Sequence, residues 1–197
     1  MLTDAFAIIG AYLIGSVSTA IITCRAMGLP DPRIGGSGNP GATNVLRIGG
    51  RKAAIITLVG DLLKGLIPVL LAHSIGVAGL PLGLVALAAF LGHLYPVFFG
   101  FQGGKGVATA GGAIMGLSLA TAGAALITWA AVAGTTRYSS LAALVAAVLS
   151  PVFMWLLGAP AAYLPPMLIM VALLIWRHGE NIQRLREGRE SHIGRKG

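Results

Sequence analysis

Long apolar stretches limit the fold of this chain more than any other feature of its sequence. Five are clear, over roughly 4–24, 53–73, 80–99, 140–157 and 160–177. A helix that crosses a bilayer needs about 20 consecutive apolar residues. Only 10% of the 197 residues are charged, whereas a soluble domain carries about 25%. We therefore predict an all-α integral membrane protein with a single domain over residues 1–197.

Residues 107–136 are less easily assigned to one helix. These 30 residues carry no charge, but four glycines interrupt them. One helix of this length would be about 45 Å long, whereas two full spans need roughly 60 Å. One long helix or two short ones therefore fit the length. The glycines that divide the segment are Gly111, Gly112, Gly116 and Gly123.

The distribution of cations decides between these alternatives. The chain has fourteen Lys and Arg residues and a net charge of +8. With Lys64 as the lone exception, these cations cluster in 25–52, at Lys105, at Arg137 and in the tail after 176. Such clusters mark the cytoplasmic side of a membrane protein, which explains the charge better than binding to nucleic acid does. All four clusters share one side only if 107–136 crosses twice. We predict two short helices that break near residues 116–123, seven transmembrane helices in total, an outer N-terminus and a cytoplasmic C-terminus.

The first polar segment runs over residues 35–52, between two apolar stretches, and contains six glycines. We interpret it as a loop whose exposed backbone N–H groups form concavities that bind anions. Arg47 adds a planar guanidinium group suited to phosphate. Hydrogen-bonding side chains are supplied by Ser37, Asn39, Thr43 and Asn44. A flexible surface loop is the alternative, but it would rarely combine these residue types so densely.

The second polar segment covers residues 92–96 and 100–109, and it places Lys105 among glycines. A helix start at Val107 would add an electropositive N-terminus, so the segment suits an anion. It does not match the Walker A pattern of nucleotide-binding loops, because Phe99 and Gly106 stand where that pattern needs Gly and Ser or Thr. The alternative is a lysine that extends to the membrane surface from a helix end.

The third polar segment, residues 177–185, follows the last apolar stretch. His178 and Asn181 are three residues apart and share a helix face if the helix continues. His178 could act as a base or as a hydrogen-bond donor. The arginines of the tail (Arg177, Arg184, Arg186, Arg189 and Arg195, with Lys196) also fit a solvated, positively charged cytoplasmic tail.

Other polar residues are less informative. Asp61 and Lys64 lie three apart in one apolar stretch, and an intramembrane ion pair is favoured over a catalytic role. Ser140, beside Arg137 and Ser139, could complete a site at the inner surface. For the single cysteine, Cys24, an inert small residue at a helix end is favoured over a reactive thiol. The sequence shows neither a zinc pattern nor paired carboxylates for magnesium, so we expect no metal and no cofactor.

The three polar segments together resemble the motifs of one family. They are Ser37-Gly-Asn-Pro-Gly-Ala-Thr-Asn-Val-Leu-Arg47, the run from Gly92 to Thr109, and Arg177-His-Gly-Glu-Asn-Ile-Gln-Arg-Leu185. In this order they are similar to the motifs of the bacterial acyl-phosphate:glycerol-3-phosphate acyltransferases. The resemblance implies a single transmembrane acyltransferase domain in the bacterial inner or plasma membrane, with seven spans and a cytoplasmic site. It implies transfer of a fatty acyl group from acyl phosphate to the 1-hydroxyl of glycerol 3-phosphate, giving lysophosphatidate and phosphate.

The resemblance also implies residue roles. It assigns catalysis to Ser37, Arg47, Lys105, His178 and Asn181. It assigns substrate binding to Gly36, Gly38, Asn39, Gly41, Thr43, Asn44, His93, Gly103, Gly104 and Gly106. Ser140 lies outside the three motifs, and we add it to the substrate-binding residues because of its expected place at the inner surface. The base is either His178 or a phosphate oxygen of the substrate. Substrates and the lipid bilayer are the expected partners, and nucleic acid is not. A transporter for a phosphorylated solute is the rival class, but the apolar stretches hold few polar residues beyond Asp61 and Lys64.

Overall fold

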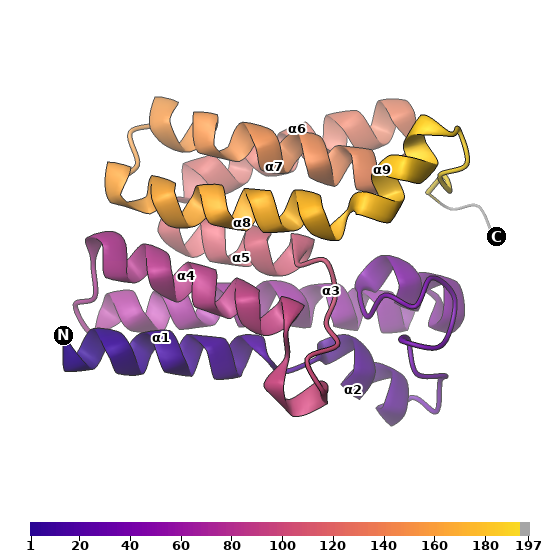
Figure 1. Cartoon of the computed structure of the whole chain (residues 1–197), viewed down its shortest axis with the longest axis horizontal. Coiled ribbons are helices and arrows are strands. Elements are labelled where there is room, and N and C mark those ends of the chain that lie inside the picture. Colours follow the sequence, from indigo (N-terminus) through magenta and orange to yellow (C-terminus); the bar gives the residue numbers. More distant parts are fainter. Residues whose placement is uncertain (194–197) are drawn as a thin grey trace.

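The computed structural model describes residues 1–193, and every regular element within that range is a helix. The helices run alongside one another in a bundle (Figure 1). The elements are α1 (Leu2–Gly15), α2 (Thr19–Ala26), α3 (Ala42–Ser74), α4 (Gly79–Leu94), η1 (Val97–Phe99), α5 (Val107–Leu117), α6 (Leu119–Thr136), α7 (Ser139–Leu156), η2 (Ala161–Tyr163), α8 (Leu164–Arg177) and α9 (Gly179–Arg186).

Five helical segments are long and apolar enough to cross a membrane. A sixth is possible if α8 and α9, which meet at a bend of 56°, form one span. Large apolar side chains such as Phe6, Ile127 and Trp155 are about 70% exposed on the outside of the bundle, where they would meet lipid. The prediction of an all-α membrane protein is therefore confirmed. The five segments are Leu2–Ala26, Ala42–Ser74, Gly79–Phe99, Leu119–Thr136 and Ser139–Leu156.

The region 107–136 divides into two helices, as predicted, and the break falls at Ser118. The Ser118 hydroxyl accepts a hydrogen bond from the backbone N–H of Thr121 at 3.3 Å, which caps the start of α6. Only the first helix is short: the 11 residues of α5 extend about 16 Å, roughly half the hydrocarbon thickness. The 18 residues of α6 reach the length of a span.

The interpretation of residues 35–52 as one loop is wrong in its second half. Helix α3 begins at Ala42, so Thr43, Asn44 and Arg47 are helical. The non-helical part ends at Gly41, which is extended at φ −149° and precedes the first helical residue. Within α3 the helix is interrupted at Gly50, whose φ of 77° lies in the left-handed region that glycine adopts at little cost.

The loop before α3 is fixed by the side chain of Asn44. Its amide nitrogen donates to the carbonyl oxygens of Pro32 at 2.8 Å and Gly35 at 2.9 Å, and its oxygen accepts from the N–H of Ser37 at 2.8 Å. Asn44 is buried. One buried side chain thus satisfies three backbone groups of this segment, which argues against the alternative of a flexible surface loop.

Glycines allow the helices on either side of the 95–106 connection to pack closely. A Cβ on Gly15 of α1 or Gly92 of α4 would collide with the backbone of the other helix. The same holds for Gly65 of α3 and Gly112 of α5. Small residues at such positions let backbones approach in a membrane, so the end of α4 and the start of α5 are held firmly against α1 and α3.

The polar segments gather at one end of the bundle (Figure 1). The connections 27–41 and 95–106 and helix α9 lie at that end, whereas the N-terminus and the turns near 75–78 and 157–160 lie at the other. Most cations of the described tail are in or near α9. Arg195 and Lys196, which the sequence analysis assigned to the same tail, lie outside the described residues.

Candidate active site

Hydrogen bonds join the three polar segments at this end of the bundle. The guanidinium group of Arg177 donates to the carbonyl oxygens of Gly103 at 2.7 Å and Gly104 at 3.2 Å, which ties the third segment to the second. Arg33, two residues before the first segment, donates to the carbonyl oxygen of Phe99 at 3.4 Å, which ties the connection before α3 to the short helix η1 between the two parts of the second segment. The structure thus places the three sequence motifs together.

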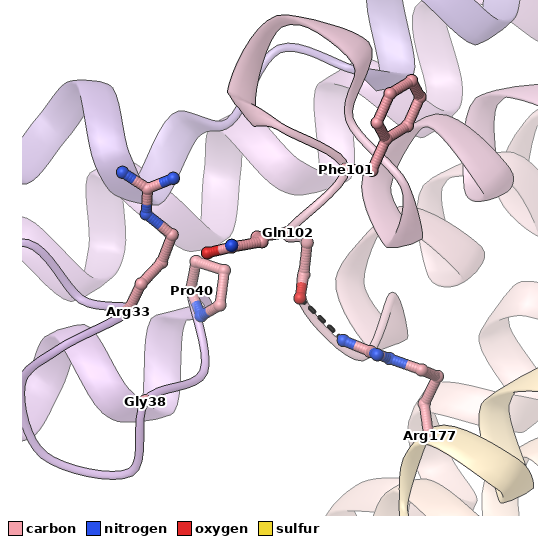
Figure 2. Close-up of a pocket in the computed structure, with 7 residues that line it drawn as sticks. Arg33, Gly38, Pro40, Phe101, Gln102 and Arg177 are labelled. Atoms are coloured by element: carbon pink, nitrogen blue, oxygen red, sulfur yellow. Dashed lines mark hydrogen bonds between the residues drawn. The ribbon is translucent and has the colours of Figure 1, made fainter.

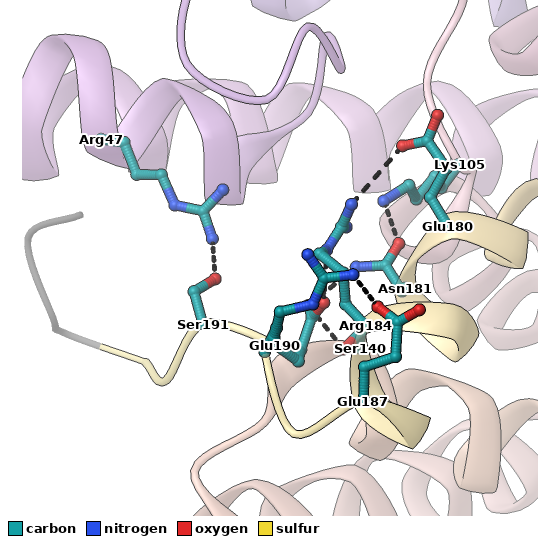
Figure 3. Close-up of polar contacts among 10 residues, drawn as sticks. Arg47, Lys105, Ser140, Glu180, Asn181, Arg184, Glu187, Glu190 and Ser191 are labelled. Atoms are coloured by element: carbon teal, nitrogen blue, oxygen red, sulfur yellow. Dashed lines mark hydrogen bonds and ion pairs between the residues drawn. The ribbon is translucent and has the colours of Figure 1, made fainter.

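Lys105 and Asn181 form the central contact of the site. The Lys105 ammonium group donates to the side-chain oxygen of Asn181 (Figure 3). Burial, with a smaller effect of the nearby Arg184 cation, lowers the pKa of Lys105 to about 8. The ammonium group is still mostly charged at neutral pH, and partial burial strengthens its interaction with an anion.

Glu190 is a site residue that the sequence analysis missed. Its buried carboxylate accepts from Ser140 at 2.9 Å, Asn181 at 2.8 Å and Arg184 at 2.8 Å. Burial alone would raise the pKa of Glu190, but the hydrogen bonds from Arg184, Asn181 and Ser140 lower it, so the group is a carboxylate. Its position in a charged tail gave no signal for this role, because only the folding back of the tail brings it to Asn181.

His178 stands where the chain bends between α8 and α9. The helix does not continue through His178, because α8 ends at Arg177 and α9 begins at Gly179, so the condition under which His178 and Asn181 would share one helix face is not met. His178 and Asn181 are nevertheless both buried. The Nδ1 atom of His178 lies 2.8 Å from the carbonyl oxygen of Leu174. Since a carbonyl only accepts, Nδ1 carries a proton, and the Nε2 atom of a neutral ring retains its lone pair.

Arg47 occupies an exposed position near the start of α3. Its guanidinium group donates to the hydroxyl of Ser191 at 2.5 Å. The tail after α9 therefore touches both Arg47 and, through Glu190, the Lys105–Asn181 contact (Figure 3). The predicted residue Ser140, at the start of α7, joins the same network through Glu190.

The glycines beside Lys105 are required by packing. A Cβ on Gly103 would collide with the carbonyl oxygens of His93 and Leu94, and one on Gly104 with the His93 ring. Gly106 has a φ of 83°, and the Phe90 ring occupies the space that a side chain would need. The sequence analysis assigned these glycines to substrate binding; their contacts show that they allow the loop to lie directly on α4.

A pocket of about 300 Å³ opens between the first and second segments (Figure 2). Two arginines border it, Arg33 from the connection before α3 and Arg177 from the end of α8. The other lining residues are Gly38, Pro40, Phe101, Gln102 and Gly103. Among the first-segment residues predicted to bind substrate, Gly38 lines this pocket. Other predicted residues lie near Gly38 in the sequence. Of these, Gly36, Ser37 and Thr43 are exposed to solvent, and Asn39 and Gly41 are partly buried.

The sequence analysis did not select Arg33, Gln102 or Arg177 as site residues. The sequence placed Arg177 in a charged tail, and only its contacts with Gly103 and Gly104 reveal another role. Within residues 1–193, no three His, Cys, Asp or Glu side chains lie together in a way that could hold a metal ion.

Several known proteins are similar to this chain over most of its length. The family model for glycerol-3-phosphate acyltransferase matches residues 5–188. A glycerol-3-phosphate acyltransferase of Thioalkalivibrio sulfidiphilus is 58% identical over 100% of this chain and 97% of its own length. One of Methylococcus capsulatus is 55% identical over 94% of each chain.

Two solved structures are similar throughout. One is PlsY (YgiH), an integral membrane glycerol 3-phosphate acyltransferase in its glycerol 3-phosphate form. It is 42% identical with a TM-score of 0.92, over 97% of this chain and 96% of that one. The lysophosphatidic acid form of PlsY gives 41% identity and a TM-score of 0.89, over 97% and 95% of the two chains. These matches cover the helices and all three polar segments, and this chain belongs to the glycerol-3-phosphate acyltransferase family.

Proposed function

We propose that this protein transfers a fatty acyl group from acyl phosphate to the 1-hydroxyl of glycerol 3-phosphate, the first step of phospholipid synthesis. The hydroxyl oxygen forms an ester bond to the acyl carbon, the bond between that carbon and the phosphate oxygen breaks, and lysophosphatidate and phosphate leave. The observation that carries this proposal is the Lys105–Asn181–Glu190 network, in which Asn181 and Glu190 are buried and Lys105 is partly buried. It lies at the polar end of an apolar bundle similar to PlsY in its glycerol 3-phosphate form.

The cations of the network suit the phosphate of glycerol 3-phosphate. Lys105 is partly buried and Asn181 is buried beside it, so both are oriented before the substrate arrives. Arg47 is exposed and can provide two parallel N–H groups to phosphate oxygens. In this role Ser140 and Asn181 orient the substrate, while Glu190 holds both of them.

Two groups could accept the proton of the attacking hydroxyl. His178 keeps the Nε2 lone pair because its Nδ1–H is engaged by Leu174. A phosphate oxygen of the substrate is the other acceptor, and the family resemblance favours it. The Glu190 carboxylate beside Asn181 is already engaged by hydrogen bonds from Ser140, Asn181 and Arg184. An acyl phosphate has a good leaving group, so no covalent enzyme intermediate is required.

The acyl phosphate fits the pocket between the first and second segments. Gly38 and Gly103 line the pocket with backbone atoms, and Arg33 and Arg177 supply positive charge. In this proposal Ser37, with the other predicted residues of the first segment (Gly36, Asn39, Gly41 and Thr43), contacts the donor phosphate. Asn44 supports them, because its side chain is used in holding the loop. The exposed Phe101 ring marks where the acyl chain would leave toward lipid.

The proposed orientation of the chain in the membrane is based on the end of the bundle that carries the positive charge. We propose seven spans, counting α5 and the bent α8–α9 pair, in the bacterial inner membrane. The N-terminus would then be outside, and the site with Lys105 and Arg177 would face the cytoplasm. Fusions of a reporter that is active only inside the cell, placed at each terminus, test this orientation. Activity at the N-terminus would overturn it.

The donor is tested by mixing the purified protein with glycerol 3-phosphate and either palmitoyl phosphate or palmitoyl-CoA. Lysophosphatidate and phosphate from the acyl phosphate alone are expected. Product from the thioester alone would contradict the proposed donor but not the enzyme class. No product from either donor, with folded protein, would contradict the proposed reaction. Uptake of glycerol 3-phosphate by vesicles that contain the protein would then test the transporter.

A further inference from the structure

A second cluster of charged and polar side chains lies inside the bundle, away from the site described above. The carboxylate of Asp61 accepts from the Thr19 hydroxyl at 2.5 Å and forms an ion pair with Lys64 at 2.9 Å. Asp61 and Lys64 are 3% and 6% exposed. Burying charged side chains inside a membrane-spanning bundle costs free energy, so Asp61 and Lys64 are expected to have a structural or functional role.

One role is local and concerns the first apolar segment. That segment is broken between α1 and α2, at residues 16–18. A break frees backbone carbonyl groups that have no water to bind in a membrane. Lys64 donates to the carbonyl oxygen of Val17 at 2.9 Å, so it satisfies one such group. This contact explains the lysine, but it does not explain why Asp61 also faces a histidine.

The histidine is His93, near the end of α4. Its Nδ1 atom lies 3.5 Å from the Asp61 carboxylate oxygen, and the ring is buried. Among the described residues, Nδ1 has no hydrogen-bond partner at normal distance. A carboxylate at this position favours a proton on Nδ1, so Asp61 orients the ring with its Nε2 atom away from the cluster.

The other edge of the His93 ring supports the loop that carries Lys105. A side chain on Gly104 would collide with His93 Nε2. The backbone N–H of Gly104 donates to the His93 carbonyl oxygen at 3.3 Å. Both the backbone and the ring of His93 therefore contact the two residues that precede Lys105.

We propose that Asp61 is a positioning residue that acts through His93 on the Gly103–Gly104–Lys105 loop. The path runs from the Asp61 carboxylate to the His93 ring and from that ring to the Gly104 backbone. In this role His93 supports the loop from behind and does not bind substrate directly. The proposal rests on the proposed function, because the readout is binding of glycerol 3-phosphate near Lys105.

The test is the double variant Asp61→Leu/Lys64→Met, which removes both charges together. Replacing a buried ion pair by apolar residues of similar size is often neutral for folding, whereas removing one partner leaves an unpaired charge. We expect a folded protein whose KM for glycerol 3-phosphate rises at least about tenfold, with a much smaller change in the KM for the acyl donor. Thr57→Val is the matched control, because Thr57 is buried on the same helix and its hydroxyl has no hydrogen-bond partner among the described residues. It should leave both KM values unchanged.

A second variant tests the contact between Asp61 and His93 without changing the ion pair, so it separates a loss of positioning from a folding defect. His93→Phe keeps a ring against Gly104, leaves the Asp61–Lys64 pair intact and removes the Nδ1–H that faces Asp61. It should raise the KM for glycerol 3-phosphate in the same way. Folded variants with unchanged KM would overturn the proposal. Loss of folding in both variants would also overturn it, since the cluster would then serve stability alone.

Calorimetric binding of glycerol 3-phosphate to the wild type and to both variants, without any acyl donor, separates this inference from the proposed reaction. Weaker binding by the variants supports positioning even if the donor assignment fails. Equal binding by all three contradicts positioning whatever the donor is.

Discussion

The side-chain nitrogen of Asn181 donates a 2.8 Å hydrogen bond to the Glu190 carboxylate, and this bond fixes the direction of the Asn181 amide. A carboxylate only accepts hydrogen bonds, so the NH₂ group of Asn181 must face Glu190. The amide oxygen therefore faces Lys105, whose ammonium group only donates (Figure 3). A residue of the tail thus determines how the site presents its central amide.

Glu190→Gln should weaken binding of glycerol 3-phosphate. The Gln side chain can donate as well as accept, so the Asn181 amide loses its defined direction, and the charge-assisted bonds from Ser140 and Arg184 weaken. Hydrogen bonds to charged groups contribute about 1.5–3 kcal/mol, so we expect the KM to rise about 10- to 100-fold. The control is Glu187→Gln, since Glu187 is exposed and, among residues 1–193, its carboxylate contacts only Gln183 and Arg189. Equal KM values for the two variants would contradict this role of Glu190.

Binding of glycerol 3-phosphate should weaken as the pH rises above about 8. The pKa of Lys105 is lowered to about 8, so the free site loses this positive charge above that pH. The phosphate of the substrate has its second pKa near 6 and stays a dianion throughout. We expect a KM that is steady near pH 7 and rises between pH 8 and 9.5.

Lys105→Arg provides the matched comparison for this pH dependence. Arginine stays charged over the whole range, so the variant should bind more weakly at pH 7 but lose the rise above pH 8. A wild-type KM that is flat from pH 7 to 9.5 would show that Lys105 does not bind the phosphate through its charge.

Gly104→Ala should disrupt the site while leaving the bundle folded. The added methyl group would meet the His93 ring and the carbonyl oxygen of Pro40, so the loop must move and carry Lys105 with it. We expect a loss of activity of at least about tenfold in kcat/KM. Gly111→Ala is the control, because a Cβ there meets nothing within 4 Å. Full activity of Gly104→Ala would show that the loop position is not critical.

Arg47→Ala should abolish most activity without changing the unfolding temperature. Arg47 is exposed and its side chain bonds only Ser191 among the described residues, so little stability depends on it. Loss of a guanidinium group from a bound phosphate should lower activity about 100-fold or more. Arg51→Ala, which removes an exposed arginine one turn further along α3, and Ser191→Ala should each change activity less than about twofold. Normal turnover by Arg47→Ala would refute its assignment to the site.

Several parts of the fold follow from local sequence. Apolar length predicted α4, α7, α8 and the part of α3 that follows its interruption at Gly50, because a membrane requires each span to satisfy its own backbone. The break within 107–136 was also predicted, although it falls at Ser118, which caps a helix better than the nearby glycines. The start of α3 at Ala42 was missed, because Gly and Asn in a sequence do not reveal that a buried Asn44 will close the loop.

The candidate site also has features that the sequence predicts and others that appear only in the folded structure. The sequence alone determined the three motifs, and it predicted Lys105 and Asn181 among their site residues because Lys and Asn side chains, and the motifs they belong to, suit a phosphate. The structure brings these two side chains into contact. Only the tertiary structure decided that Glu190 sets the direction of Asn181 and that Asp61 faces His93. Each contact joins residues from different parts of the fold: Glu190 of the tail with Asn181 of α9, and Asp61 of α3 with His93 of α4. Burial is what gives such pairs their strength, and burial exists only once the helices have packed.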